Sequence, residues 1–185
     1  MKSKFYEHGE HGPHGEYSPW KISGQNKKIL NTLNDLIRIN IDRVTAYEKA
    51  SHDDTTPEPE FRELFYRLGT DSRAYVNTLH AEVIRLGGAP VTQSTITGKI
   101  YLYWLEGKHS FDGVDTASRL AACIEAESAV QKAYQQALDE QNQLPERIYQ
   151  LVENQLWGVE RAHQQLVSIH ESHNSSSLVN NPPSS

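Results

Sequence analysis

The stretch from Leu151 to Leu166 constrains the fold of this chain most, because it places an acid and an imidazole within one helical pattern. Residues that suit a buried face recur there at steps of three and four, which is the spacing of one side of an amphipathic helix. They are Leu151, Val152, Gln155, Val159, His163, Leu166 and His170. His163 is therefore predicted to point inward, and a buried imidazole needs a partner.

Composition excludes several classes of protein. A chain of 185 residues with 37% apolar and 23% charged residues suits one globular domain. The net charge of -6 argues against binding to nucleic acid. A single cysteine, Cys123, excludes a disulfide framework and a Cys-based zinc finger, which fits a reducing compartment. Since no stretch approaches the roughly 18 apolar residues of a membrane span, we predict a cytoplasmic protein that binds neither membranes nor nucleic acid.

Both ends of the chain have the composition of disordered segments. Residues 1–24 are rich in Gly, Pro, His and Glu, which cannot form a core. Histidines at the spacing of His8, His11 and His14 can gather around zinc, nickel or copper; the alternative is a solvated tail. Residues 173–185 are also predicted to be a disordered tail, which leaves one domain over residues 25–172.

Four long segments of that domain carry helical periodicity, each with a polar residue in the middle of its apolar face. The segments run over about residues 25–51, 59–86, 115–141 and 145–172. Asn40 lies within the first such face, whereas Asp42 is predicted to point away. The second face contains Ser72 and Tyr75, and the third contains Glu127. This pattern predicts an all-α four-helix bundle with a polar layer inside it.

The connection over residues 88–113 is longer than a typical unstructured linker, and it contains the aromatic residues Tyr101, Tyr103 and Trp104. We expect a short helix near residues 99–107. Such a crossover lets the chain traverse the bundle, so that the second and third helices run parallel. One crossover of this kind is the ferritin-like arrangement, and we therefore predict a ferritin-like four-helix bundle.

The polar residues at the middle of the four faces form a candidate site. A four-helix di-iron carboxylate site takes a Glu from each of two helices and a Glu-x-x-His from each of the others. The second half of the chain supplies three candidate metal ligands, Glu127, Glu160 and His163. The corresponding places in the first half are occupied by candidates for a buried polar network, Asn40, Ser72 and Tyr75.

Three states of this layer remain open from the residues alone. Two glutamates and His163 could hold one ion of iron, manganese or zinc. A metal-free network could form instead, in which Glu127 accepts hydrogen bonds from His163, Tyr75 and Asn40. A working di-iron pair is the third state, and it requires ligands that the first half of the chain lacks.

Several motifs occur in a characteristic order along the chain. They are Leu33-Asn-Asp-Leu-Ile-x-Ile-Asn-x-Asp42, Tyr47-Glu-Lys-Ala50, Ala81-Glu-Val-x-Arg-Leu-Gly-Gly-x-Pro90, Glu127, Ala133-Tyr-x-x-Ala-Leu138, Leu144-Pro145 and the stretch from Gln155 to His163. Together they resemble an uncharacterised bacterial family of ferritin-like four-helix-bundle proteins, over about residues 28–172. The resemblance implies a ferritin-like fold, a bacterial source and self-association as a homodimer, and it brings no established activity.

The same motifs have a degenerate similarity to the di-iron site of bacterioferritins and rubrerythrins. That similarity assigns ligand positions to Glu127, Glu160 and His163, with Asn40, Ser72 and Tyr75 as departures. Three functions follow as alternatives. The chain is a metal-binding or stress-associated protein with a degenerate metal site, a non-catalytic module for self-association or protein docking, or a di-iron oxidoreductase. No catalytic residue is assigned, because oxygen activation needs both halves of the ligand set.

Overall fold

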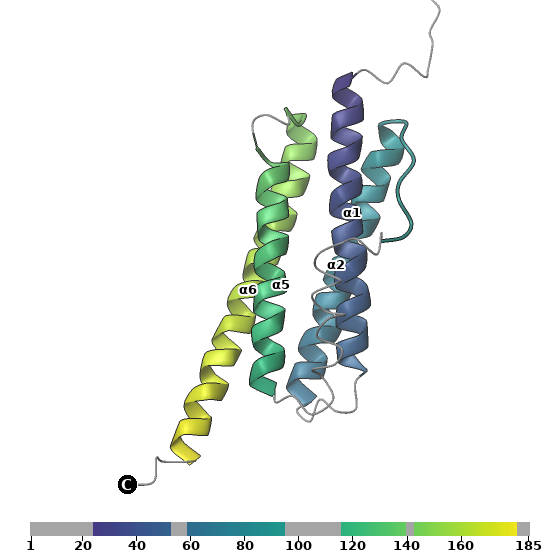
Figure 1. Ribbon diagram of the computed structural model, residues 1–185. Helices are drawn as coiled ribbons and strands as arrows, with labels where there is room; N and C mark the ends of the chain where they lie inside the picture. Colours follow the sequence, from purple (N-terminus) through teal and green to yellow (C-terminus); the bar gives the residue numbers. More distant parts are fainter. Residues whose placement is uncertain (1–23, 53–58, 95–115, 140–142, 181–185) are drawn as a thin grey trace, which may run out of the picture.

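The computed structural model describes residues 24–52, 59–94, 116–139 and 143–180. The described residues form four α-helices and no β-strand (Figure 1). The helices are α1 (Gly24–Ser51), α2 (Pro59–Arg85), α5 (Thr116–Ala137) and α6 (Glu146–Asn180). The predicted all-α class is confirmed for this part of the chain, and none of its helices is long and apolar enough to cross a membrane.

Two helix ends differ from the sequence prediction. α5 stops at Ala137, where Leu138 N bonds back to Gln135 O at 3.2 Å in the tight geometry common at helix ends. α6 continues past residue 172 to Asn180, so residues 173–180 are helical where a disordered tail was predicted. The ring of His173 lies 6.4 Å from that of Phe61, which extends the contacts of α6 beyond the predicted end.

The helices form two hairpins, α1 with α2 and α5 with α6, which lie side by side (Figure 1). Asn40 of α1 bonds to Tyr134 of α5, and Arg43, further along α1, bonds to Glu127, which comes earlier in α5. α1 and α5 are therefore antiparallel. Because α2 is also antiparallel to α1, α2 and α5 run in the same direction, and the end of α2 and the start of α5 lie at opposite ends of the bundle (Figure 1). The predicted short helix near residues 99–107 lies outside the described residues.

The start of this connection is fixed by local hydrogen bonds. Gly87 has a φ of 76°, in the left-handed region that glycine adopts at little cost. Gly87 N donates to Ile84 O at 2.9 Å, and Gly88 N donates to Val83 O at 2.9 Å. These two bonds form a Schellman cap, which ends α2 at the Gly87-Gly88 pair.

A side chain of α1 then holds the next residues of the chain. Asn34 Nδ2 donates to Ala89 O at 3.3 Å, and Val91 N donates to Asn34 Oδ1 at 3.0 Å. His80 Nε2 lies 2.8 Å from Val91 O, and only a protonated nitrogen can bond to that carbonyl. These hydrogen bonds hold residues 89–91, which follow the end of α2, against the side of the α1–α2 hairpin.

The buried side chains divide into two apolar clusters at different levels of the bundle. The first cluster includes Leu33, Ile37, Leu79, Val83, Val130, Ile148, Val152 and Val159. The second includes Tyr47, Phe61, Leu64, Phe65, Leu68, Leu120, Cys123, Ala162 and Leu166. All four helices contribute to each cluster. Between the two levels lie the buried polar residues of α1 and α5, so the polar layer predicted from the sequence separates two halves of the core.

Glu82 ties the end of α2 to the start of α6. Its carboxylate, which is buried, accepts hydrogen bonds from Arg85 Nε at 2.7 Å and from Arg147 Nε at 2.8 Å. Burial alone would raise the pKa of Glu82, but the bonds and charges of the two arginines outweigh it and lower the pKa from its ordinary value of 4.5. The carboxylate therefore stabilises the fold in its ionised form.

Replacement of Glu82 with glutamine is expected to lower the free energy of unfolding by about 1 kcal/mol at pH 7, because both arginines are largely exposed and solvent screens the pairs. Since the folded pKa is depressed, this contribution is present above pH 4.5 and is lost as the pH falls through the folded pKa. Urea unfolding of parent and variant at pH 7 and pH 3 measures it. Glu63→Gln, an exposed charge on the same helix, serves as the control; an equal difference between Glu82→Gln and parent at both pH values would contradict the prediction.

Candidate functional site

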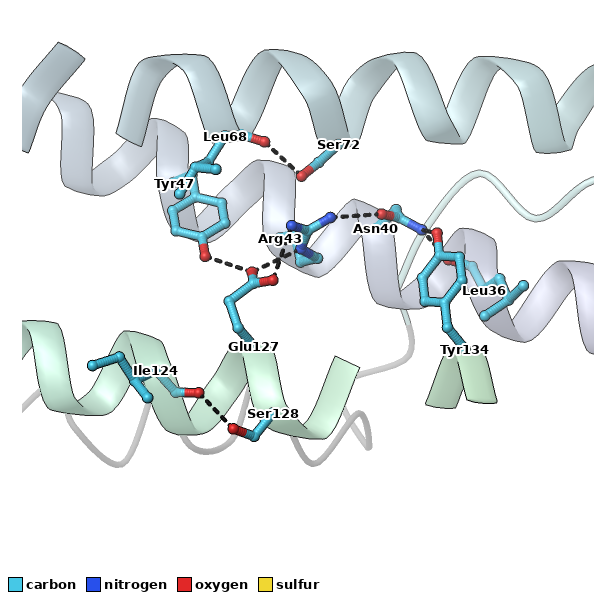
Figure 2. Close-up of polar contacts among 10 residues, drawn as sticks. All are labelled: Leu36, Asn40, Arg43, Tyr47, Leu68, Ser72, Ile124, Glu127, Ser128 and Tyr134. Atoms are coloured by element: carbon cyan, nitrogen blue, oxygen red, sulfur yellow. Dashed lines mark hydrogen bonds and ion pairs between the residues drawn. The ribbon is translucent and has the colours of Figure 1, made fainter. Parts of the chain in front are cut away.

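Glu127 lies at the centre of the polar layer, with only 1% of its surface exposed. Its two carboxylate oxygens accept hydrogen bonds from Arg43, from Nε at 2.9 Å and from Nη2 at 3.1 Å. Tyr47 donates its hydroxyl to Glu127 Oε1 at 2.5 Å. This bidentate contact between guanidinium and carboxylate is among the strongest ion pairs in proteins, and both oxygens of Glu127 accept a hydrogen bond in it (Figure 2).

Arg43, which is also buried, holds the opposing charge. Burial by itself would lower the pKa of Arg43, but the neighbouring charge of Glu127 more than offsets it, and the pKa is raised. The guanidinium carbon lies 5.9 Å from the centre of the Tyr47 ring, within the range of a cation–π contact. Arg43 is therefore a permanent positive charge beside Glu127.

The hydrogen bonds continue from this pair to the other helices. Arg43 Nη1 donates to Asn40 Oδ1 at 3.2 Å, and Asn40 Nδ2 donates to the Tyr134 hydroxyl at 2.7 Å. Tyr134 donates to Gln155 Oε1 at 2.8 Å, and Gln155 Nε2 donates to Thr78 Oγ1 at 2.8 Å. A single bonded series thus passes through α5, α1, α6 and α2. Figure 2 shows its first part, from Glu127 to Tyr134.

The energetics of such a layer depend on its completeness. A buried ion pair loses its hydration, and the mutual attraction offsets that cost only when the remaining polar atoms are also bonded. Here Asn40 Nδ2 has a second acceptor, Leu36 O, at 2.8 Å. The layer consequently adds little net free energy compared with apolar packing, yet it strongly penalises any arrangement of the helices that separates its members.

Glu127 and Asn40 lie in this layer, as predicted from the sequence, but Glu127 has other partners than those of the predicted metal-free network. In the metal-free alternative His163, Tyr75 and Asn40 donate to the carboxylate, whereas in the structure Arg43 and Tyr47 do so. The spacing of residues in the sequence could have indicated that Arg43 and Tyr47 are buried. Leu36, Asn40, Arg43 and Tyr47 follow one another at steps of four, three and four, which is the spacing of a buried helical face.

The three predicted metal ligands are not gathered into one site. Glu127 is bonded to Arg43, while His163, half-buried, has its Nε2 3.0 Å from Ser128 Oγ. Glu160 is partly exposed on α6. Among the described residues, no three His, Cys, Asp or Glu side chains lie in a group that could hold a metal ion. A divalent cation beside Glu127 would also be repelled by the Arg43 charge, so the residues do not fit a metal centre of the di-iron type.

The remaining network candidates lie near the layer without joining it through their side chains. Ser72 is fully buried, and its hydroxyl donates to Leu68 O of its own helix at 2.7 Å. The Tyr75 hydroxyl lies where a Cβ on Gly158 would be, which shows how closely α2 and α6 approach there. Burial raises the pKa of Tyr75. Tyr75 therefore packs against α6, while Ser72 is satisfied within α2.

Asp42 and Cys123 are two further buried groups whose burial raises their pKa. Asp42 was predicted to point away from the core, but only 4% of its surface is exposed, and burial raises its pKa although a hydrogen bond from Ser94 opposes the rise. α1 is therefore covered on this side by the connection after α2. Cys123 is buried in the second cluster, and burial raises the pKa of its thiol to about 12. A thiol held in that state is a poor nucleophile and a poor metal ligand.

One comparison with known proteins identifies a relationship. A family model described as "Domain of unknown function (DUF2383)" matches residues 28–140. The match contains α1, α2 and α5, and thus both Arg43 and Glu127, while Glu160 and His163 lie beyond it. No curated protein matches the chain.

Proposed function

We propose that this chain, which belongs to the family of domains of unknown function DUF2383, is a non-catalytic helical module that acts by binding another protein. One observation carries the proposal: the carboxylate at the centre of the bundle is already neutralised by an arginine. The interior of the four helices is then a structural element, and the functional surface lies on the outside of the bundle.

The position of Arg43 argues for this function over metal handling. Both oxygens of Glu127 accept from the guanidinium, and Tyr47 adds a third hydrogen bond to the same carboxylate. A metal ion would have to displace all three donors and leave a cation buried beside it, which is costly. The same argument disfavours the oxidoreductase alternative, because oxygen chemistry at iron needs carboxylates that are free to bind it.

We also propose that the fold is of the ferritin-like type. The order of the helices and the shared direction of α2 and α5 support it, since a single long crossover distinguishes this arrangement from a simple up-down-up-down bundle (Figure 1). In this interpretation the chain keeps the arrangement of a metal-binding bundle, with an arginine–glutamate pair in the place where such bundles hold their ligands.

Metal analysis tests the proposed function. Protein purified without a nickel column, with His8, His11 and His14 replaced by alanine, is expected to contain less than about 0.1 equivalent of iron, manganese or zinc by plasma emission spectroscopy. It is also expected to consume no oxygen when ferrous iron is added. The three histidine substitutions remove the metal-binding capacity of the amino-terminal segment, so any remaining metal belongs to the rest of the chain.

The opposite result has a distinct signature. One or two equivalents of metal that survive gel filtration, and that are lost in His163→Ala or Glu160→Gln, would show that α6 supplies ligands after all. His170→Ala is the matched control, because it removes a half-exposed histidine from the same helix. Metal retained in that control and lost in His163→Ala would overturn the non-catalytic, metal-free proposal.

A further inference from the structure

The outward face of α6 carries two aromatic side chains that the bundle does not cover. Trp157 is 56% exposed and Tyr149 is 38% exposed. The two residues are eight positions apart in one helix, so they lie about 12 Å from each other along its axis. Single exposed apolar residues are ordinary, but an exposed indole and a second exposed aromatic ring on the same helix are typical of a binding surface.

Acidic residues border both rings. Glu146 precedes Tyr149 by three positions, Glu153 lies four positions from each ring, and Glu160 follows Trp157 by three. Residues three or four apart are neighbours on a helix surface, so these five side chains form one continuous strip along α6. We call this set of Glu146, Tyr149, Glu153, Trp157 and Glu160 the acidic aromatic strip.

The charge of the strip is not balanced within the bundle. Among the residues that the structure describes, neither Glu153 nor Glu160 takes part in an ion pair. Glu146 accepts a hydrogen bond from the neutral side chain of Gln150 at 2.6 Å. Arg147 is directed to Glu82 of α2, which leaves Arg161 as the cation nearest to Trp157 along α6. Along α6 the strip therefore carries three carboxylates, with one arginine within four residues of Trp157.

Resting on the proposed function, we propose that the acidic aromatic strip binds a basic amphipathic helix of another protein. Arginine side chains fit it best, because a guanidinium stacks on an indole and pairs with a carboxylate in two-pronged geometry. A partner helix that carries arginine at steps of three and four would place its cations along the strip, as helix-in-groove recognition does with apolar anchors.

A second copy of this chain is a poorer occupant of the same surface. A two-fold contact brings the strip against the same strip of a second copy, so its carboxylates would meet a surface that also carries three carboxylates. Like charges brought together in this way disfavour the contact. The strip therefore favours an oppositely charged partner over self-association.

Fluorescence anisotropy with a dye-labelled probe tests the proposal on the full chain. The probe is an alanine-based helical peptide with arginine at steps of three and four, compared with the same peptide carrying glutamine in place of arginine. We expect the arginine peptide to bind and the glutamine peptide not to bind. Trp157→Ala and the double variant Glu153→Gln, Glu160→Gln should each weaken binding at least tenfold, with helix content unchanged by circular dichroism.

Matched substitutions elsewhere separate the strip from a general effect of charge. Tyr66→Ala removes a ring of α2 that is 61% exposed, and Glu63→Gln with Glu125→Gln removes two exposed charges from α2 and α5. These variants should bind like the parent. Three results would each contradict the strip as a site for a basic helix. They are equal losses of binding in these control variants, no binding of the arginine peptide to the parent, and a dimer in sedimentation velocity that Trp157→Ala abolishes. Such failures without metal uptake leave the proposed function standing, whereas metal uptake in the bundle refutes that function itself.

Discussion

Replacement of Glu127 with alanine is expected to lower the free energy of unfolding by about 3–5 kcal/mol, because Arg43 would remain as an uncompensated charge in the core. Tyr47 would lose the acceptor of its hydroxyl in the same change. A domain of this kind has only about 5–15 kcal/mol of stability in total. Urea unfolding followed by circular dichroism measures the loss, with Glu125→Ala, an exposed acid two residues away, as the control.

A compensating variant keeps this prediction testable if the single change prevents folding. Arg43→Met, Tyr47→Phe and Glu127→Leu made together remove both charges and the dependent hydroxyl. Because an apolar replacement of a whole buried pair is often neutral or stabilising, this triple variant is expected to regain most of the stability that Glu127→Ala loses. A loss below about 1 kcal/mol in Glu127→Ala, or a triple variant less stable than the single one, would refute the role of the ion pair.

The second large effect is expected for Tyr134→Phe, which should cost about 2 kcal/mol. The Tyr134 hydroxyl accepts from Asn40 at 2.7 Å and donates to Gln155 at 2.8 Å, and all three residues are buried. Removal of one oxygen would leave Gln155 Oε1 without the only donor that it has among the described residues. No cavity large enough to matter is created, so the loss reports hydrogen bonding and not packing.

Thermal unfolding with calorimetric detection measures the effect of Tyr134→Phe. A change of about 2 kcal/mol corresponds to a fall in Tm of roughly 4–8 °C for a chain of this length. Tyr149→Phe removes the same atom from a partly exposed tyrosine of α6 and should leave Tm within about 1 °C of the parent. A Tyr134→Phe variant as stable as Tyr149→Phe would mean that the series from Asn40 to Gln155 does not bind the helices together.

The buried positions of Asn40 and Glu127 could be predicted because helical periodicity is visible in the sequence of a single helix. Steps of three and four residues identify the side of a helix that faces a core, and Asn40 and Glu127 were placed correctly by that rule. The long connection implied a crossover, and the contacts of α1 with α5 agree with it. These features depend on single helices and on segment lengths, which a sequence displays directly.

The failures concern pairs of residues on different helices and faces covered by non-helical chain. Arg43 was overlooked because a cation is usually placed at the surface, and only its partner on α5 makes burial acceptable. Asp42 was assigned to solvent because the periodicity of α1 gives no sign of the chain that follows α2, where Ser94 lies. The proposed ligand set combined residues that share a level of the bundle but have other partners, as His163 has in Ser128.

The division of the ion pair between the two hairpins has a consequence for how the molecule assembles. Arg43 belongs to the α1–α2 hairpin and Glu127 to the α5–α6 hairpin, so each hairpin on its own carries an unneutralised charge in its most apolar surface. Separation of the hairpins would also expose both apolar clusters, which are built from all four helices, so the two hairpins are expected to fold cooperatively. An exchange of hairpins between two chains, by contrast, would preserve every bond of the layer, because the arginine recognises the glutamate without regard to which chain supplies it.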